Sequence, residues 1–134
     1  MRRVSKKRGR LNRAVASVRA EFREAFPFCM WPGCGLRATD LHELARGPAR
    51  GKALSERAAW LHLCLAHHVE CGDYSIGGIP TQLAVKRNAD PFDYSRVAVN
   101  RLRGRQDDAI TEAEVDAAWV ALLASLAARG IAVI

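Results

Sequence analysis

All four cysteines and all four histidines of the 134-residue chain lie between positions 29 and 71. Four residues separate Cys29 from Cys34 in the segment Cys-Met-Trp-Pro-Gly-Cys, and two residues separate Cys64 from His67. Two such pairs supply the sulfur and imidazole donors that surround a structural zinc ion in a tetrahedron. The spacing therefore predicts a Cys3His zinc site made of these four residues.

Two alternatives to this ligand set stay open. Cys71 lies four residues after His67 and can replace it as the fourth ligand. The four cysteines can instead form two disulfides, as they do in small secreted domains. The first ten residues are positively charged, but no apolar segment follows them as in a signal peptide, so we expect an intracellular protein in which zinc is favoured.

A second group of polar side chains lies between the two ligand pairs and directly after them. The segment 39–44 reads Thr-Asp-Leu-His-Glu-Leu, and His68 follows the predicted zinc ligand His67. A zinc ion that joins the two pairs would bring His42 close to His68. Two imidazoles and a carboxylate can bind a divalent cation with open positions, which favours phosphodiester hydrolysis. Asp40 alternates with His42 on a strand and is a reserve ligand.

The remaining histidines can be assigned from their neighbours. Adjacent residues on a helix point about 100° apart, so His67 and His68 can each serve a different metal ion. His62 stands between two leucines, and we interpret it as a core histidine without a ligand role.

The positive charge of the chain is concentrated near its start. Seven basic residues and no acidic residue occupy positions 1–13, namely Arg2, Arg3, Lys6, Lys7, Arg8, Arg10 and Arg13. The rest of the chain has 14 of the 21 basic residues against 14 acidic residues, so the net charge of +7 comes from this basic arm (residues 1–13). Such an arm can neutralise phosphates of DNA, although a solvated tail is an equal alternative.

Two further sets of basic residues were considered as DNA contacts. Arg46, Arg50 and Lys52 lie in a segment of loop composition, and we expect them to add to DNA binding. Arg96, Arg101, Arg103 and Arg105 lie on a predicted helix and its end, where we favour a solvated surface.

The apolar pattern and the capping residues predict the helices and strands that position these residues, and together they indicate an α+β fold. The apolar pattern predicts a helix from Leu11 to Phe26, and the strands 41–44 and 60–63 follow, the second leading into Cys64. Further helices are predicted over 66–70, over 81–88, and after a cap at Asp93 or Ser95; the last starts at a capping box formed by Thr111 and Glu114. We divide the chain into a basic arm with a helix (1–26), a zinc-stapled core (27–78) and a helical region that packs on the core (79–134).

The order of these motifs resembles a known family. Cys29-x4-Cys34, Asp-Leu-His-Glu-Leu at 40–44 and Leu-Cys-x2-His-His at 63–68 are similar to the zinc-stapled branch of the HNH endonucleases, especially small phage and prophage proteins. The resemblance covers roughly residues 28–75. It implies a ββα-metal fold, in which a two-stranded ribbon and a helix surround a catalytic cation.

The resemblance also implies roles for individual residues. Cys29, Cys34, Cys64 and His67 would bind the structural zinc, and His42 and His68 would bind a catalytic cation such as Mg2+ or Mn2+. Glu43 stands where the family has its general-base histidine, and Ala59 stands where the family has an asparagine that orients the loop and the base.

The function expected from these observations is a metal-dependent DNA endonuclease of phage or prophage origin in the cytoplasm of a bacterial host. The alternative is a catalytically inactive zinc module that binds DNA or phage packaging proteins, and Ala59 and Glu43 favour it. No run of about 18 apolar residues is present, so no membrane partner is expected. A transcription regulator is disfavoured because no helix-turn-helix pattern is found.

Overall fold

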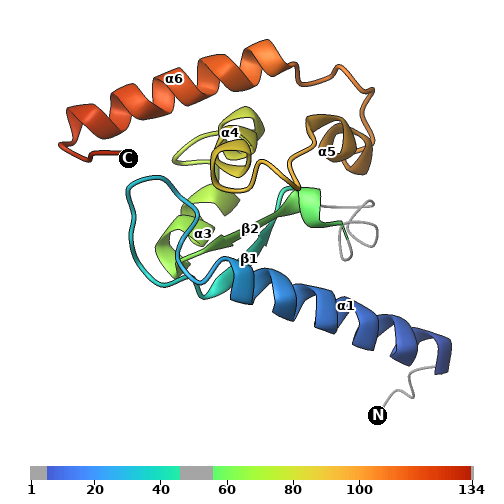
Figure 1. Cartoon of the computed structure of the whole chain (residues 1–134). Coiled ribbons are helices and arrows are strands. Elements are labelled where there is room, and N and C mark those ends of the chain that lie inside the picture. The colour runs from blue at the N-terminus through green and yellow to red at the C-terminus, as the bar shows by residue number, and fades with distance from the viewer. Residues whose placement is uncertain (1–5, 46–55, 134) are drawn as a thin grey trace.

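The computed structural model describes residues 6–45 and 56–133, with side chains from residue 13 onward. This part of the chain is α+β, with one antiparallel pair of strands and five α-helices (Figure 1). In chain order the elements are α1 (Lys6–Ala25), β1 (Asp40–Glu43), the short 3-10 helix η2 (Arg57–Ala59), β2 (Trp60–Leu63), α3 (Leu65–Gly72), α4 (Ile79–Ala89), α5 (Arg96–Leu102) and α6 (Glu112–Ala128).

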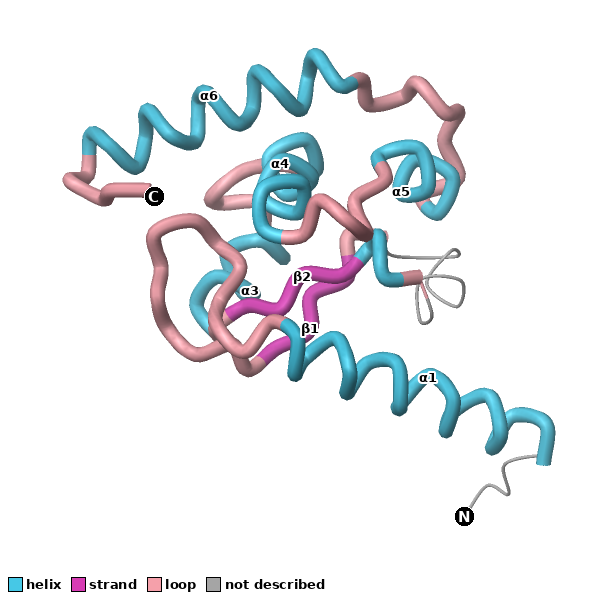
Figure 2. The backbone as a smooth tube through the Cα atoms, viewed as in Figure 1, coloured by secondary structure: helices cyan, strands magenta, loops and turns pink. Residues whose placement is uncertain are grey.

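Helix α1 begins at Lys6, five residues earlier than the apolar pattern predicted. The segment before Leu11 is rich in lysine and arginine, which are good helix formers, so the second half of the basic arm is helical. The helix ends before Pro27, as predicted, and extends away from the body of the molecule towards its N-terminal end (Figure 2). Its Phe22 is fully buried and meets the ring of Trp60 edge-on, at a centroid distance of 5.5 Å.

The strands β1 and β2 form a ribbon whose two faces have different neighbours. Asp40 pairs with Leu63, and His42 pairs with Leu61. Because side chains alternate along a strand, His42 faces one side of the ribbon and Glu43 the other. Helix α3 follows β2 and contacts both strands.

The C-terminal helices cover the ribbon and α3 (Figure 1). Helix α4 packs against α6, and one continuous buried core includes Phe22, Trp60, Leu83, Val99 and Val115. The core therefore joins α1, the ribbon and the C-terminal helices.

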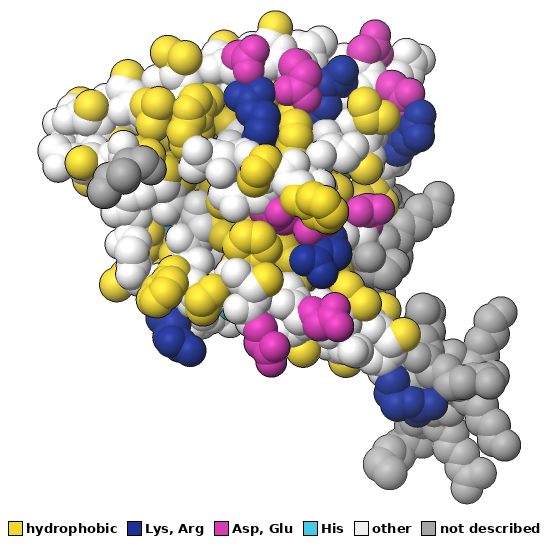
Figure 3. All heavy atoms as spheres, in the orientation of Figure 1, with side chains coloured by type: hydrophobic (Ala, Val, Ile, Leu, Met, Phe, Trp, Pro, Cys, Tyr) yellow, Lys and Arg dark blue, Asp and Glu magenta, His cyan; other side chains and the backbone are white. Residues whose placement is uncertain are grey.

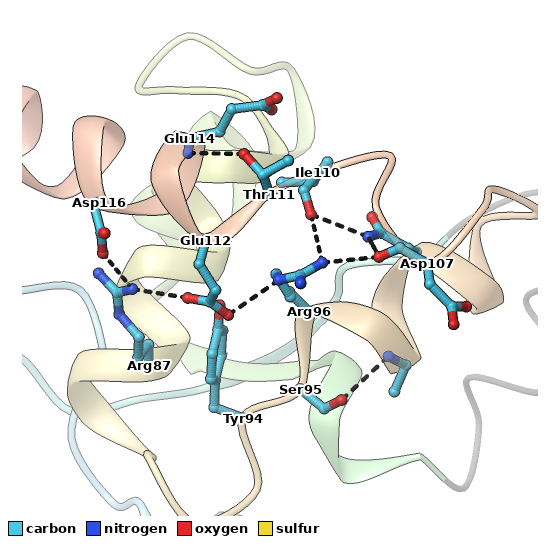
Figure 4. A network of polar contacts seen from close by, with 12 residues as sticks. Arg87, Tyr94, Ser95, Arg96, Asp107, Ile110, Thr111, Glu112, Glu114 and Asp116 are labelled. Carbon is cyan, nitrogen blue, oxygen red and sulfur yellow. Dashed lines mark hydrogen bonds and ion pairs between the residues drawn. The ribbon is translucent and has the colours of Figure 1, made fainter.

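Polar contacts fix the angle between α4, α5 and α6 (Figure 4). Arg87 of α4 donates to both Glu112 and Asp116 of α6. Thr111 accepts a hydrogen bond from the Glu114 backbone N–H at 3.2 Å, so the predicted N-cap of α6 is confirmed.

None of the helices within 6–45 and 56–133 combines the length and the apolar character that crossing a membrane requires.

Candidate metal centre and adjacent histidine pair

Four side chains from two separate segments, 29–34 and 64–67, converge on one point. The ligand atoms of Cys29, Cys34, Cys64 and His67 all lie within 4.8 Å of one another. Cys29 Sγ and Cys64 Sγ lie 3.4 Å and 3.3 Å from His67 Nδ1, and the Sγ atoms of Cys34 and Cys64 lie 3.9 Å apart. The predicted convergence of these four residues is confirmed, and this Cys3His cluster can bind a metal ion such as zinc.

The donor set fits tetrahedral zinc in chemistry and in spacing. Zn–S bonds of about 2.3 Å and Zn–N bonds of about 2.0–2.1 Å place neighbouring ligand atoms of a tetrahedron about 3.6–3.8 Å apart. The three separations in the cluster lie close to this value. Thiolate sulfur and imidazole nitrogen are also the ligands that structural zinc prefers.

Local backbone geometry brings the first two cysteines together. Gly33 has φ +76°, which favours glycine, and a Cβ at this position would lie 2.4 Å from the Ile131 side chain. The Cys34 N–H donates to the Trp31 carbonyl in this turn, and the Cys29 N–H donates to the Leu36 carbonyl at 2.7 Å. The chain therefore folds back on itself between the two thiols, and the C-terminal segment closes over the turn.

The other two ligands are placed by the start of α3. Cys64 is the residue before the helix, and His67 lies in its first turn. The indole of Trp31, which is buried, stacks on the His67 ring at a centroid distance of 5.5 Å and an angle of 18°. This stack restricts the rotation of the imidazole and keeps its Nδ1 directed at the thiols.

Burial sets the protonation of this cluster before a metal binds. Burial raises the pKa of the Cys29 thiol to about 12, and burial lowers the pKa of His67. A neutral imidazole is the form that binds metal, whereas the thiols must lose protons when they do. Metal binding is therefore coupled to proton release from the cysteines.

The structure groups His67, and not Cys71, with Cys29, Cys34 and Cys64. All four cysteines are free, and the 3.9 Å between Cys34 Sγ and Cys64 Sγ is far longer than a disulfide bond. Cys71 is fully buried but is not part of the group of four. Its carbonyl accepts a hydrogen bond from the Gln82 side chain at 3.0 Å.

A pair of histidines lies next to this cluster. His42 on β1 and His68 on α3 face each other with their Nδ1 atoms 3.2 Å apart, and their rings meet edge-on. His42 is 2% exposed, while His68 is half-buried. His68 follows the zinc-cluster residue His67 but points to a different neighbour, as the rotation of a helix requires.

Gln82 of α4 also contacts His42, a contact that the sequence analysis missed. The Gln82 side chain is fully buried, and its Oε1 lies 2.8 Å from His42 Nε2. The sequence carried only one signal for it: a polar residue at the start of the predicted helix 81–88, next to the apolar residues 83–85.

Glu43 and Asp40 have their own partners. Glu43 forms an ion pair with Arg19 of α1, on the face of the ribbon opposite His42. Asp40 accepts a hydrogen bond from the Thr39 hydroxyl at 2.7 Å. His62 is buried, and its Nδ1 lies 2.6 Å from the Phe26 carbonyl oxygen, which agrees with a structural role.

Most of the residues predicted to contact DNA lie outside the part that the structure describes. Arg2, Arg3, Arg46, Arg50 and Lys52 belong to the ranges 1–5 and 46–55. The described cap of η2 is Glu56, whose side chain accepts from the Ala58 N–H. Lys6, Lys7, Arg8 and Arg10 lie on α1, whose side chains are described only from residue 13.

Three of the four arginines of the α5 region, Arg96, Arg101 and Arg103, are engaged within the molecule, whereas Arg105 is exposed. Arg96 contacts Glu112 and donates to the Asp107 and Ile110 carbonyls (Figure 4). Arg101 pairs with Asp107. Arg103 donates to the Leu44 carbonyl at 2.8 Å. Figure 3 shows basic and acidic side chains next to one another along the edge formed by α5 and α6, a mixed surface that is unsuited to phosphate binding.

Comparison of the chain with protein-family models, with curated proteins and with solved structures finds no match.

Proposed function

We propose that the chain is a metal-dependent DNA endonuclease of the HNH type, with β1, β2 and α3 as its ββα-metal core. The observation that carries the proposal is the Nδ1–Nδ1 distance of 3.2 Å between His42 and His68. Two ligand nitrogens on one cation, each about 2.0–2.1 Å from it, lie close to this distance when the angle between them is near 90–100°. The spacing of the two nitrogens therefore suits a shared cation once both nitrogens are unprotonated.

The remaining elements of the site have separate roles in this proposal. The Cys3His cluster joins the loop before β1 to the start of α3 and so fixes His68 relative to His42. A cation on these two histidines would polarise the scissile phosphate and lower the pKa of a bound water. Glu43, next to His42 in β1, is proposed as the proton acceptor on the resemblance alone, because its side chain lies on the other face of the ribbon and pairs with Arg19. No phage or prophage origin is needed for this chemistry, but the resemblance favours one.

The substrate is proposed to be DNA because of the basic arm. Seven basic residues without an acidic residue can release several counterions from a phosphate backbone, which gives affinity without sequence preference. Helix α1 begins inside this arm and extends from the body of the molecule, so part of the charge lies on an element that projects from the body (Figure 2).

The proposal is tested with supercoiled plasmid. The zinc-loaded protein is incubated with Mg2+ or Mn2+, and nicked and linear products are measured. We expect cleavage by the wild type, and loss of cleavage of at least 100-fold in His42→Ala and His68→Ala, each with zinc content unchanged at one ion per chain. Arg101→Ala, at an exposed residue of α5 that pairs with Asp107, is a matched control that should cleave normally. Full activity in His68→Ala would refute the site.

A second candidate function is a catalytically inactive zinc module that binds DNA or docks on phage packaging proteins. The ion pair between Glu43 and Arg19 favours it, because it places the carboxylate on the α1 face of the ribbon. Ala59, at the position of the family's asparagine, is fully buried and offers no polar side chain.

The two candidates differ in their response to variants. For the inactive module, replacing the seven basic residues of the arm by glutamine should weaken DNA binding and flatten its salt dependence, while no metal supports cleavage by the wild type. For the enzyme, Glu43→Gln should lower the cleavage rate by about 100-fold, within the range of lost general-base catalysis. If the wild type and Glu43→Gln cleave equally well, the protein is an endonuclease in which Glu43 has no catalytic role.

A further inference from the structure

Gln82 makes two hydrogen bonds that together define its orientation. Its side-chain nitrogen lies 3.0 Å from the Cys71 carbonyl, and its side-chain oxygen lies 2.8 Å from His42 Nε2. A backbone carbonyl can only accept hydrogen bonds, so the NH2 group of the amide must face Cys71. The oxygen of the amide must then face His42, and the assignment of the two ends follows from the partners.

This orientation fixes the proton of His42. An amide oxygen only accepts, so the Nε2 atom that faces it must carry the hydrogen. A neutral imidazole has one N–H, and its second nitrogen is then unprotonated. The lone pair of His42 therefore lies on Nδ1, the atom that faces His68 Nδ1 at 3.2 Å.

We propose that Gln82 is a positioning residue that holds His42 in the Nε2–H tautomer and so makes Nδ1 its metal-binding atom. The metal-binding part rests on the proposed function, whereas the tautomer does not. In the metal-free protein, His68 Nδ1–H donates to His42 Nδ1. Binding of a cation between the two rings requires His68 to give up this proton, while His42 stays as it is.

The place of Gln82 in the fold supports a positioning role. The Gln82 side chain is fully buried on α4, the helix that follows α3 in the chain. Gln82 and His42 are 40 residues apart in the sequence. The other partner of Gln82 is the last full turn of α3, the helix that carries His68. One amide therefore ties together the three elements that hold the histidine pair, and it leaves no hydrogen-bonding group of its own unsatisfied in the core.

The direct test is NMR of the zinc-loaded protein with 15N-labelled histidine, at a pH above 7.5 and without a second cation. We expect His42 to show pyrrole-type 15N at Nε2 and pyridine-type 15N at Nδ1. A wild-type His42 with its hydrogen on Nδ1 would overturn the proposal. On addition of Mg2+, the hydrogen of His68 should move from Nδ1 to Nε2 while the His42 pattern stays unchanged.

Variants separate positioning from stability. Gln82→Met has a similar shape but no acceptor, and it should mix the His42 tautomers and weaken Mn2+ binding, measured by calorimetry, by about 10–100-fold. Gln82→Glu keeps an oxygen that faces His42 and should keep the Nε2–H form, at a cost in stability because its second oxygen faces the Cys71 carbonyl, which also only accepts. Leu83→Ala, the neighbouring fully buried residue, should lower the melting temperature without changing the tautomer. A tautomer unchanged in Gln82→Met would refute the positioning role.

The proposal and the nuclease can fail separately. Suppose that the wild type cleaves no plasmid, but that its His42 has the Nε2–H form and Gln82→Met loses this form. The positioning role of Gln82 is then supported, and the nuclease function is refuted. Suppose instead that the wild type cleaves plasmid, and that Gln82→Met changes neither the His42 tautomer nor the Mn2+ affinity. The nuclease function is then supported, and the positioning role of Gln82 is refuted.

Discussion

Arg19 of α1 and Glu43 of β1 form an ion pair across the face of the ribbon that His42 does not occupy. Both side chains are mostly buried, with 22% and 13% of their surface exposed. The guanidinium of Arg19 also lies over the Trp60 ring, 5.3 Å from its centroid. The pair therefore links the basic helix to the ribbon, and its first consequence concerns stability.

Removal of either partner takes one ion-pair partner away from a partly buried charge. Arg19→Gln and Glu43→Gln should each lower the free energy of unfolding by about 1–3 kcal/mol, and the double variant should cost less than their sum. Urea unfolding of the four proteins measures this coupling. Strictly additive effects would show that the two charges do not stabilise each other.

The Cys3His cluster is expected to hold the fold together as well as the site. It joins the turn near Cys29 to the start of α3, and the free energy of zinc binding adds to that of folding, about 10–16 kcal/mol in small zinc domains. Cys64→Ser should bind less than one zinc ion per chain and melt at least 10 °C lower than the wild type. Cys71→Ser is the matched control, because Cys71 is buried outside the cluster. Zinc loss in Cys71→Ser but not in Cys64→Ser would contradict the ligand set.

A buried ion pair on α4 should lose more stability when one partner is replaced than when both are replaced. Lys86 is fully buried, its Nζ lies 2.7 Å from Asp90 Oδ2, and the same atom lies 4.7 Å from the centroid of the Phe22 ring. Asp90→Ala leaves the lysine charge unpaired and should cost about 3–5 kcal/mol, whereas the double variant Lys86→Met, Asp90→Ala should recover most of that loss. Chemical denaturation compares them, and equal losses in the single and double variants would show that the unpaired charge is not the cause.

The pH dependence of stability should include a contribution from His62. Burial, and then the nearby positive charge of Arg23, lowers the pKa of His62 in the folded protein below its unfolded value of about 6.5. The unfolded chain then binds more protons between the two values, so this contribution is present above about pH 6.5 and is lost as the pH falls through the folded pKa.

His62→Asn removes this titration while its amide can still donate to the Phe26 carbonyl. The free energy of unfolding of the variant should fall less steeply between pH 7 and pH 5 than that of the wild type. Zinc release in acid affects both proteins equally, so the difference between the two curves is the measured quantity. Parallel curves would assign the acid sensitivity to other groups.

The Cys3His cluster was predictable from sequence because its signal is local and chemically specific. The spacing of Cys29 with Cys34, and of Cys64 with His67, is dictated by how a short turn and a helix start present ligands, and no tertiary information is needed. The cap of α6 at Thr111 was predictable for the same reason, since its partner Glu114 is three residues away.

The contacts that the sequence did not predict join elements far apart in the chain. Arg19 and Glu43 are 24 residues apart, and Gln82 and His42 are 40 residues apart. Whether α1 and α4 lie on opposite faces of the ribbon depends on how the whole core packs, and a single sequence carries no periodicity that records it. The early start of α1 was missed because a charged segment without an apolar stripe still has high helix propensity.

The hydrogen bond between Gln82 and His42 places an evolutionary constraint on this chain. In descendants that keep the imidazole in β1, position 82 should vary only among side chains that offer an oxygen, and loss of one partner should be followed by loss of the other. Covariation of positions 42 and 82 should therefore distinguish distant homologues of this chain from zinc domains that merely share its cysteine spacing.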